Sequence, residues 1–310
     1  MNLVEKLKQL AERVYRLEWN IALVENSLEG LFQGEQLNLR MLKHSYTDRW
    51  FADPFILDVK GKKIFLLVEE WMRKENKSRI AKLTINLEDF SLESTIPVLE
   101  MEKVLSFPAI YRKNGKIFIY PEMSENGVSR IFEYDTEHNS CISSEFLSQR
   151  KVIDGVMTDL FGETLLFGTE KPNSNGKKLN VYRKSTDGFE LSNQILFSED
   201  IARMAGNFFS YEGNIYRPTQ DCNKTYGNGV VIQRCDMQDG KLRMDNVFRL
   251  YSTDEKYRFG FHTFNMYNNV IIGDALYFKH PWIRKIARRV YDCFLVNEER
   301  RTMNERRRRS

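Results

Sequence analysis

Two aspartates stand where a pair of carboxylates could act on a sugar. Asp53 opens the segment DPFILDV and Asp154 lies in IDGVMTDL, so each comes at the start of a short apolar run. Two carboxyl groups that converge on one cavity can divide acid–base work, with one held ionised and the other tuned by its surroundings. Both also fit a structural role, because Asp before Pro or Gly often begins a turn. The pair predicts a carbohydrate site if the fold brings the two together.

Further polar residues at comparable positions widen this candidate site. Glu122 ends the segment IFIYPE and Glu170 follows LLFGT, and either glutamate could supply a second acid from a loop. Asn207 offers an amide, and His262 begins a later apolar run, where an imidazole could transfer a proton or contact a ligand. Each glutamate also fits an exposed strand end, and a lone histidine often has a purely structural role.

A polar cluster follows another apolar strand and enters a turn that ends at Gly227. An arginine offers a planar fork for phosphate or carboxylate, glutamine and aspartate can bind sugar hydroxyls, and a tyrosine can stack on a sugar face. The same residues could instead form a hydrogen-bond network that holds the turn. The members of the cluster are Arg217, Gln220, Asp221 and Tyr226.

An internal repeat supplies the elements that would position these residues. Five segments share one form, in which a short apolar strand, a turn with Gly or Asn, and a second apolar strand follow one another. Polar segments with weaker strand patterns lie between them and supply outer strands. A period of about 50 residues with four strands per unit is the size of a propeller blade. The five turns are centred on Gly61, Gly115, Gly162, Gly213 and Asn269.

The repeat predicts an all-β, five-bladed β-propeller with short N- and C-terminal helices. The segment WNIALV at 19–24 is an extra strand before the first unit, and we expect it to complete the last blade, because an open ring would expose sheet edges. The alternative is a β-sandwich of unrelated hairpins. The expected organisation is an N-terminal helix over 1–17, a propeller over 18–278, and a basic amphipathic helix with a tail over 279–310.

Four segments resemble the N-terminal propeller domain of plant glucosamine inositolphosphorylceramide transferases and its bacterial stand-alone relatives. They are WFADPFILDVKGKKIFLLVEE, LSFPAIYRKNGKIFIYPE, VIDGVMTDLFGETLLFGT and NIYRPTQDCNKTYGNGV. The resemblance covers roughly residues 18 to 275, and nothing here resembles the separate glycosyltransferase domain of the plant proteins. More distantly, the ADPF segment is similar to the first blade of family 43 glycoside hydrolases, which are also five-bladed.

The more distant resemblance implies roles for the two aspartates. Asp53 falls where the hydrolases keep a general base, and Asp154 where they keep a carboxylate that orients the substrate. Their general acid, a glutamate of the fourth blade, has no counterpart, because that stretch is MAGNFFSY with Asn207. A glycosidase must protonate a poor leaving group, whereas phosphate leaves as a stable anion. The departure favours transfer from an activated donor.

Three functions follow. In the first, the chain transfers sugar in surface-polysaccharide or glycolipid assembly, with Asp53 as base, Asp154 and His262 positioning the sugar, and Arg217 meeting donor phosphate. The second is a furanosidase-like hydrolase that uses Asp53 with Glu122 or Glu170. The third is a non-catalytic glycan-binding module. No cofactor is expected, and no residue set has metal-ligand spacing, although the resemblance allows one cation in the central channel.

Composition and charge indicate the cellular compartment and the kinds of partner that we expect for the protein. The four cysteines have no paired spacing and the N-terminus has no signal-peptide core, so we expect a cytoplasmic protein. Basic residues gather in 279–310, where a helix with Trp282 at its border is compatible with the inner face of an anionic membrane. Packing of that helix on the propeller is the alternative. Basic charge confined to a tail, without a recognised motif, argues against nucleic-acid binding.

Overall fold

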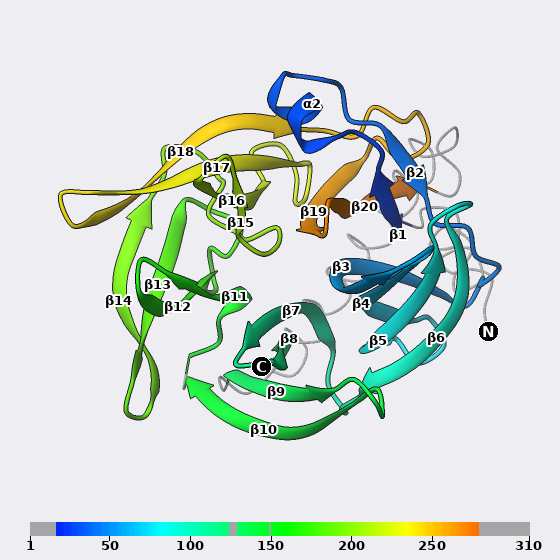
Figure 1. The fold of residues 1–310 in the computed structure, drawn as a ribbon, viewed down its shortest axis with the longest axis horizontal. Helices are drawn as coiled ribbons and strands as arrows, with labels where there is room; N and C mark the ends of the chain where they lie inside the picture. The colour runs from blue at the N-terminus through cyan, green and yellow to red at the C-terminus, as the bar shows by residue number, and fades with distance from the viewer. Residues whose placement is uncertain (1–16, 124–128, 149, 279–310) are drawn as a thin grey trace, which may run out of the picture.

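A computed structural model of the chain describes residues 17–123, 129–148 and 150–278. The expected helix before residue 17 and the basic helix and tail over 279–310 lie outside the described residues. Across the described residues, the chain forms five four-stranded antiparallel sheets arranged around a common centre (Figure 1). The predicted five-bladed β-propeller is therefore confirmed.

Each of the first four blades is built from four strands that follow one another along the chain. The first blade holds β3 (Arg49–Lys60), β4 (Lys63–Met72), β5 (Lys77–Asn86) and β6 (Ser91–Leu99). The second holds β7 (Leu105–Lys113), β8 (Lys116–Met123), β9 (Ser129–Asp135) and β10 (Ser140–Ser148). The third holds β11 (Ile153–Leu160), β12 (Glu163–Thr169), β13 (Lys178–Ser185) and β14 (Gly188–Leu196). The fourth holds β15 (Phe209–Tyr211), β16 (Asn214–Asp221), β17 (Gly229–Gln238) and β18 (Lys241–Leu250).

The fifth blade joins the two ends of the described chain and closes the ring. It contains β19 (Gly260–Tyr267) and β20 (Val270–Phe278), followed in space by β1 (Leu17–Val24) and β2 (Leu39–Met41). β1 pairs with β20 along its whole length, from Leu17 opposite Phe278 to Val24 opposite Ile271. The strand expected over 19–24 is confirmed in place and partner, and it begins slightly earlier. A short helix, α2 (Leu28–Phe32), lies between β1 and β2.

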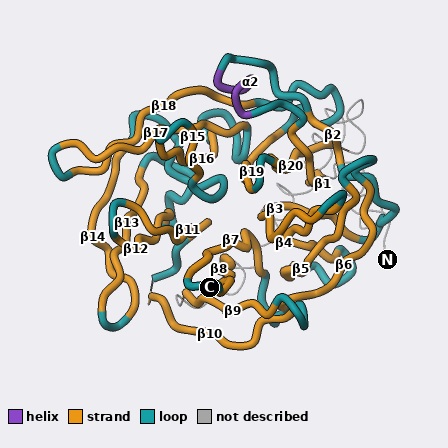
Figure 2. Tube along the Cα trace, in the orientation of Figure 1, coloured by secondary structure: helices purple, strands orange, loops and turns teal. Residues whose placement is uncertain are grey.

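The five predicted hairpins form the two inner strands of each blade, around the centre of the ring (Figure 2). Because all five blades repeat one topology, the hairpin turns lie at the same end of the ring. The turn residues have the left-handed backbone that such short connections need, with φ of 75° at Gly115 and 60° at Asn269. The opposite end of the ring carries the starts of the innermost strands, where Asp53 and Asp154 lie. We call this end the mouth.

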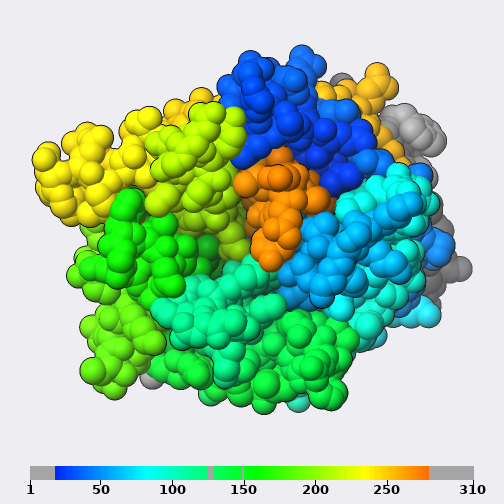
Figure 3. Space-filling model, viewed as in Figure 1, coloured from blue at the N-terminus to red at the C-terminus, as the bar shows by residue number. Residues whose placement is uncertain are grey.

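Apolar side chains fill the spaces between neighbouring blades. Ile21 and Leu23 of β1 pack with Phe51 and Ile56 of β3, so one core joins the last blade to the first. The space-filling view shows the blades packed side by side around the centre (Figure 3). Among the described residues, no helix is long and apolar enough to cross a membrane.

Because β1 closes the ring, a cavity in it should destabilise the whole domain. Ile21 is fully buried, so Ile21→Ala should lower the free energy of unfolding by about 2–5 kcal/mol. Leu196→Ala is the matched control, since Leu196 is 76% exposed and its loss should change stability by about 0.5 kcal/mol or less. Urea unfolding measures both, and equal effects would contradict closure through β1.

Candidate active site

A repeated irregularity of the innermost strands creates the mouth. The register of the inner hairpin shifts between Ala52 and Phe55 in the first blade, and at the equivalent place in the second and third. The residue inside each bulge has left-handed backbone, with φ of 51° at Asp53, 46° at Phe107 and 45° at Asp154. Such backbone is strained for residues other than glycine and is concentrated at functional sites. Each bulge turns one side chain toward the centre of the ring.

The second strand of each blade contributes a polar residue beside these bulges. The seventh residue of β4, β8, β12 and β16 is Glu69, Glu122, Thr169 and Gln220, respectively. Glu69 stands opposite Ala52 and Glu122 opposite Ser106, so both lie next to a bulge. The mouth is therefore lined by two sets of equivalent positions, one from each inner strand.

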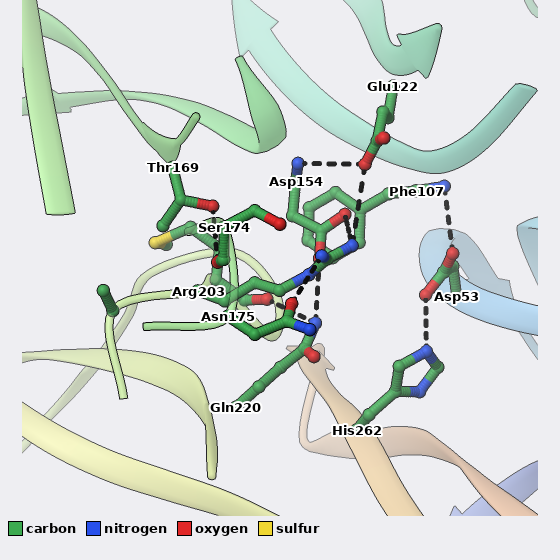
Figure 4. Close-up of polar contacts among 12 residues, drawn as sticks. Asp53, Phe107, Glu122, Asp154, Thr169, Ser174, Asn175, Arg203, Gln220 and His262 are labelled. Atoms are coloured by element: carbon green, nitrogen blue, oxygen red, sulfur yellow. Dashed lines mark hydrogen bonds and ion pairs between the residues drawn. The ribbon is translucent and has the colours of Figure 1, made fainter. Parts of the chain in front are cut away.

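Asp53 is held at the mouth by three neighbours (Figure 4). Its Oδ2 accepts a hydrogen bond from the Phe107 amide at 3.1 Å, and its Oδ1 lies 3.3 Å from Nε2 of His262. Its own amide donates to Oδ2 of Asp274 at 2.8 Å. These contacts fix the carboxyl group from the second blade and the fifth.

Burial controls the ionisation of this carboxyl group. It raises the pKa of Asp53 to about 7; His262 opposes the rise, and the carboxylates of Asp154 and Asp274 add to it. Glu69 is hydrogen-bonded to Asp53, and burial beside that carboxyl group raises its pKa well above the ordinary value. The pair favours a shared proton, because two close carboxylates resist ionising together.

His262 is fixed in orientation from both sides. Its Nδ1 lies 2.6 Å from Oδ1 of Asp274, which also accepts the Thr263 amide at 3.2 Å. The Trp19 ring stacks on the imidazole at 3.8 Å between centroids and 17° between planes. Burial lowers the pKa of His262, but Asp274 and Asp53 outweigh it, so the net shift is upward. The imidazole is thereby aimed at Asp53.

Asp154 is held in a second polar cluster across the mouth. Nε and Nη2 of Arg203 lie 2.5 Å and 3.2 Å from its two carboxylate oxygens, a bidentate contact. Nε2 of Gln220 donates to Oδ2 at 2.8 Å. The Asp154 amide in turn donates to Oε2 of Glu122 at 3.3 Å. The guanidinium and the amide together bind both carboxylate oxygens of Asp154.

Glu122 is the carboxyl group of this cluster best suited to carry a proton. Burial raises its pKa to about 8, with Asp154 adding to the rise and Arg203 opposing it. Its carboxylate lies 3.7 Å from Nη2 of Arg203, and its side chain is 14% exposed. A carboxyl group with this pKa can hold its proton at neutral pH, beside the arginine-bound Asp154.

Arg203 and Tyr226 form the outer part of the same cluster. Nη1 of Arg203 donates to Oδ1 of Asn175 at 2.8 Å, and its guanidinium lies 5.0 Å from the centroid of the Tyr226 ring. Tyr226 is 42% exposed and meets the His262 ring edge-on at 5.5 Å. An exposed aromatic ring that bridges the two clusters could stack on a sugar.

The structure thus brings six of the sequence-predicted residues to the mouth. They are Asp53, Glu122, Asp154, Gln220, Tyr226 and His262. Four other predicted residues lie elsewhere, for different reasons.

Arg217 and Asp221 point away from the mouth because side chains alternate along β16. Gln220 faces the mouth, so Arg217 and Asp221 project from the other face of the strand. Arg217 is fully buried, where it donates to Oε1 of Gln233 at 2.6 Å and to the Ala202 carbonyl. Its expected contact with donor phosphate therefore does not fit its position.

Asp221, Glu170 and Asn207 belong to other networks. Asp221 accepts hydrogen bonds from Arg249 at 2.7 Å and Tyr251 at 2.6 Å, the structural role considered for this cluster. Oε1 of Glu170 accepts from the Tyr182 hydroxyl at 2.6 Å. Asn207 donates to the Ile110 carbonyl at 3.0 Å and borders a cavity of about 200 Å³ near the opposite ends of β7 and β11.

The sequence analysis missed Glu69, Arg203, Asp274 and Trp19. Glu69 carried a signal, because aligning the hairpins at their turns places it at the same position as Glu122. Trp19 and Asp274 lie in predicted strands without a motif that singles them out. Arg203 lies between β14 and β15, in a segment that no repeat describes.

Asp53, His262 and Asp274 could also be considered as metal ligands, because one ligand atom of each lies within 4.8 Å of the others. Both imidazole nitrogens of His262 already face a carboxylate oxygen, at 2.6 Å and 3.3 Å. An imidazole that carries protons can bind these carboxylate oxygens without a metal ion. We therefore assign no metal to the three residues. The cation allowed in the central channel stays a prediction.

The bidentate contact between Arg203 and Asp154 should be needed for stability at alkaline pH. Removing the cation with Arg203→Met leaves buried Asp154 and Glu122 without compensation and should cost about 3–5 kcal/mol at pH 8. The penalty should shrink at pH 5, because protonation removes the uncompensated charge. Denaturant unfolding at both values tests this, with Arg203→Lys as the charge-retaining control. An equal penalty at both pH values would contradict the assignment.

Glu122 should make stability fall as pH rises. Its pKa in the folded protein is about 8 and its ordinary value is 4.5, so the folded state binds its proton more tightly. Between these values stability declines with pH, by at most about 1.4 kcal/mol per pH unit from this group. Glu122→Gln should remove that decline. Parallel stability curves for wild type and variant between pH 5 and 8 would show that the carboxyl group titrates normally.

A solved structure shares this five-bladed architecture. An exo-β-1,3-galactanase from Phanerochaete chrysosporium, solved with galactose, superposes with a TM-score of 0.53 at 8% sequence identity. The superposition covers 71% of this chain and 59% of the galactanase chain. At this identity the likeness shows a shared fold.

Sequence comparison gives a more specific relationship. The chain is 24% identical over 200 residues to glucosamine inositolphosphorylceramide transferase 1 of Oryza sativa subsp. indica, and 24% identical over 197 residues to that of Arabidopsis thaliana. The matches cover 62% and 61% of this chain, and the chain spans 27% and 26% of these relatives. A family model described as glucosamine inositolphosphorylceramide transferase 1, N-terminal, matches residues 39–258. The chain therefore belongs to this N-terminal domain family.

Proposed function

We propose that the mouth binds a saccharide and acts on a glycosidic bond by general acid–base catalysis, with Glu122 as acid and Asp53 as base. The observation that carries this proposal is the environment of Glu122, a largely buried carboxyl group beside the arginine-bound Asp154, where burial raises its pKa to about 8. Acid–base chemistry at a sugar requires one carboxyl group that carries a proton and another that can accept one.

The proposed step is balanced by these two groups. The Glu122 carboxylic acid donates its proton to the glycosidic oxygen as the bond to the anomeric carbon breaks. The Asp53 carboxylate takes a proton from the attacking hydroxyl group, which belongs to water in hydrolysis or to a second sugar in transfer. Asp154 holds Arg203 in place, and His262 fixes the position of Asp53. Tyr226 offers a ring face for the bound sugar.

This proposal places chemistry at a glycosidic bond ahead of transfer from a phosphate-activated donor, which the sequence analysis favoured. The missing carboxylate of the fourth blade favoured transfer from a phosphate-activated donor. The contact between Glu122 of the second blade and Asp154 supports Glu122 as the acid, and with an acid present an activated leaving group is not required. Arg217, the expected phosphate contact, is fully buried, and Arg203 at the mouth is already paired with Asp154.

A phosphate-activated donor is the second candidate, and the family relationship favours it, because the relatives are named as transferases. The two candidates differ in what binds. A nucleotide sugar or a sugar phosphate should stabilise the folded protein under the second proposal, whereas a neutral saccharide should do so under the first. Thermal unfolding in the presence of each ligand class separates them. The proposed cytoplasmic location and a membrane contact through 279–310 would suit a lipid-linked acceptor under either proposal.

Aryl glycosides with good and poor leaving groups should reveal the roles of the two carboxyl groups. Glu122→Gln should lower kcat by about 10²–10⁴ for a poor leaving group and much less for a dinitrophenolate, which needs no proton. Asp53→Asn should lower kcat for both substrates. A panel of aryl furanosides and pyranosides, with and without added sugar acceptors, measures hydrolysis and transfer together.

Glu170→Gln is the matched control, because Glu170 is bound to Tyr182 away from the mouth. It should leave both rates within about twofold. Equal losses in Glu122→Gln for good and poor leaving groups would rule out its role as the acid. Unchanged ligand binding with no turnover of any glycoside or donor would support the third function, a glycan-binding module.

A further inference from the structure

A pair of tryptophans lies at the mouth, outside the residues discussed so far. Trp50 of β3 and Trp71 of β4 are directly opposite each other in the ladder, and their rings are stacked with centroids 5.7 Å apart and planes 10° apart. Both are partly exposed. Trp50 lies three residues before Asp53 on the innermost strand, so the pair extends the first blade beyond the bulge.

Strand geometry places this pair next to the candidate catalytic residues. Trp71 follows Glu69 by two residues on β4, so both side chains project from the same face of the strand. Glu69 in turn is hydrogen-bonded to Asp53 and lies close enough to Glu122 for the two to repel. On the first blade, the buried Glu69 therefore lies between Asp53 and the tryptophan pair.

The neighbouring blade borders the tryptophan pair. Ser78, the ladder partner of Trp71, donates its hydroxyl to the Leu105 carbonyl of β7 at 2.6 Å. The pair consequently lies where the first blade meets the second, the blade that carries Glu122. A ligand that extends from the mouth between these blades would pass over the indole rings.

Charged side chains hold the strand ends that carry the two indoles. Arg49 and Arg79 both bind the buried carboxylate of Glu70, at 2.6 Å and 2.7 Å, and Arg79 also reaches Glu100 at 3.1 Å. These residues alternate with the indoles along the strands, so the network lies on the opposite face of the blade and holds the strand ends from behind. The indole pair suits a sugar, whose ring offers C–H groups to stack on an aromatic face.

We propose that Trp50 and Trp71 form a sugar-stacking subsite, which binds a second unit of an oligosaccharide whose glycosidic bond lies between Asp53 and Glu122. The inference rests on the proposed function and names its substrate class as an oligosaccharide. The pair also stabilises the sheet, since a cross-strand aromatic pair contributes about 0.2–1 kcal/mol. The experiment must therefore separate ligand binding from stability.

The test compares a trisaccharide with its monosaccharide on the full chain. β-1,3-Galactotriose with galactose, and xylotriose with xylose, serve as probes in isothermal titration calorimetry. The wild type should bind at least one trisaccharide more tightly than its monosaccharide. Trp71→Ala should weaken trisaccharide binding about tenfold or more, which corresponds to about 1.4 kcal/mol, and leave monosaccharide binding within about twofold. Trp50→Ala should act in the same direction.

Two further variants exclude a general loss of structure. Trp71→Phe keeps an aromatic face and should restore most of the trisaccharide affinity. Phe161→Ala removes an exposed ring from the β11–β12 turn, at the other end of the ring of blades, and should change neither affinity. Unfolding curves for each variant report the structural contribution separately.

The outcomes distinguish this inference from the proposed function. If the wild type binds no saccharide of either length, the proposed function fails. If the monosaccharide binds but the trisaccharide gains nothing, or if Trp71→Ala leaves the trisaccharide gain intact, the subsite alone is overturned. Loss of both affinities in Trp71→Ala with retention of both in Trp71→Phe would also overturn it, because the indole would then support the mouth as a whole.

Discussion

Closure of the ring through β1 and β20 is the constraint on which the site depends. Asp53 comes from the first blade and its partners His262 and Asp274 from the fifth, and these two blades become neighbours only when the ends of the described chain pair. The core that joins them contains residues of β1 itself. An open array of five hairpins would keep Asp53 and Asp154 but would separate Asp53 from the imidazole that positions it. Fold and chemistry are therefore coupled through one strand pairing.

Repulsion among the crowded carboxyl groups at the mouth opposes folding. The residues that contact each carboxyl group show how the fold tolerates this repulsion. Asp154 has a bidentate arginine, Asp274 has an imidazole and two backbone amides, and Asp53 has an amide and the same imidazole. Glu69 and Glu122 have fewer compensating donors, and their pKa values rise instead. Burial also raises the pKa of Asp53, to about 7, although an amide and the imidazole contact it. Close pairing at some carboxyl groups and raised pKa values at others together let the mouth hold so many acids.

The sequence predicted the fold well because the propeller is a repetition of local patterns. Each hairpin has its own alternation of apolar residues and its own turn residue, so no long-range information was needed to find it. The site was predicted in part, because each bulge changes the direction of a single side chain. The alternation of apolar and polar residues in the sequence does not reveal where a bulge lies. Alternation along β16 explains why Gln220 reaches the mouth whereas Arg217 does not. Arg203 could not be found, because its position depends on the path of an irregular segment between blades.

Equivalent positions in different blades carry different side chains, and these differences determine which chemical groups line the mouth. The bulge carries Asp in the first and third blades and Phe in the second, while the seventh residue of the next strand is Glu, Glu, Thr and Gln in the first four. The bulges of the first three blades share one backbone conformation, so these blades differ at that position through side-chain identity. The proposed acid, Glu122, comes from the second blade, whereas the resembled hydrolases keep theirs in the fourth. Because all blades face one centre, moving a carboxyl group from one blade to another changes the direction from which the proton reaches the sugar and leaves the scaffold intact.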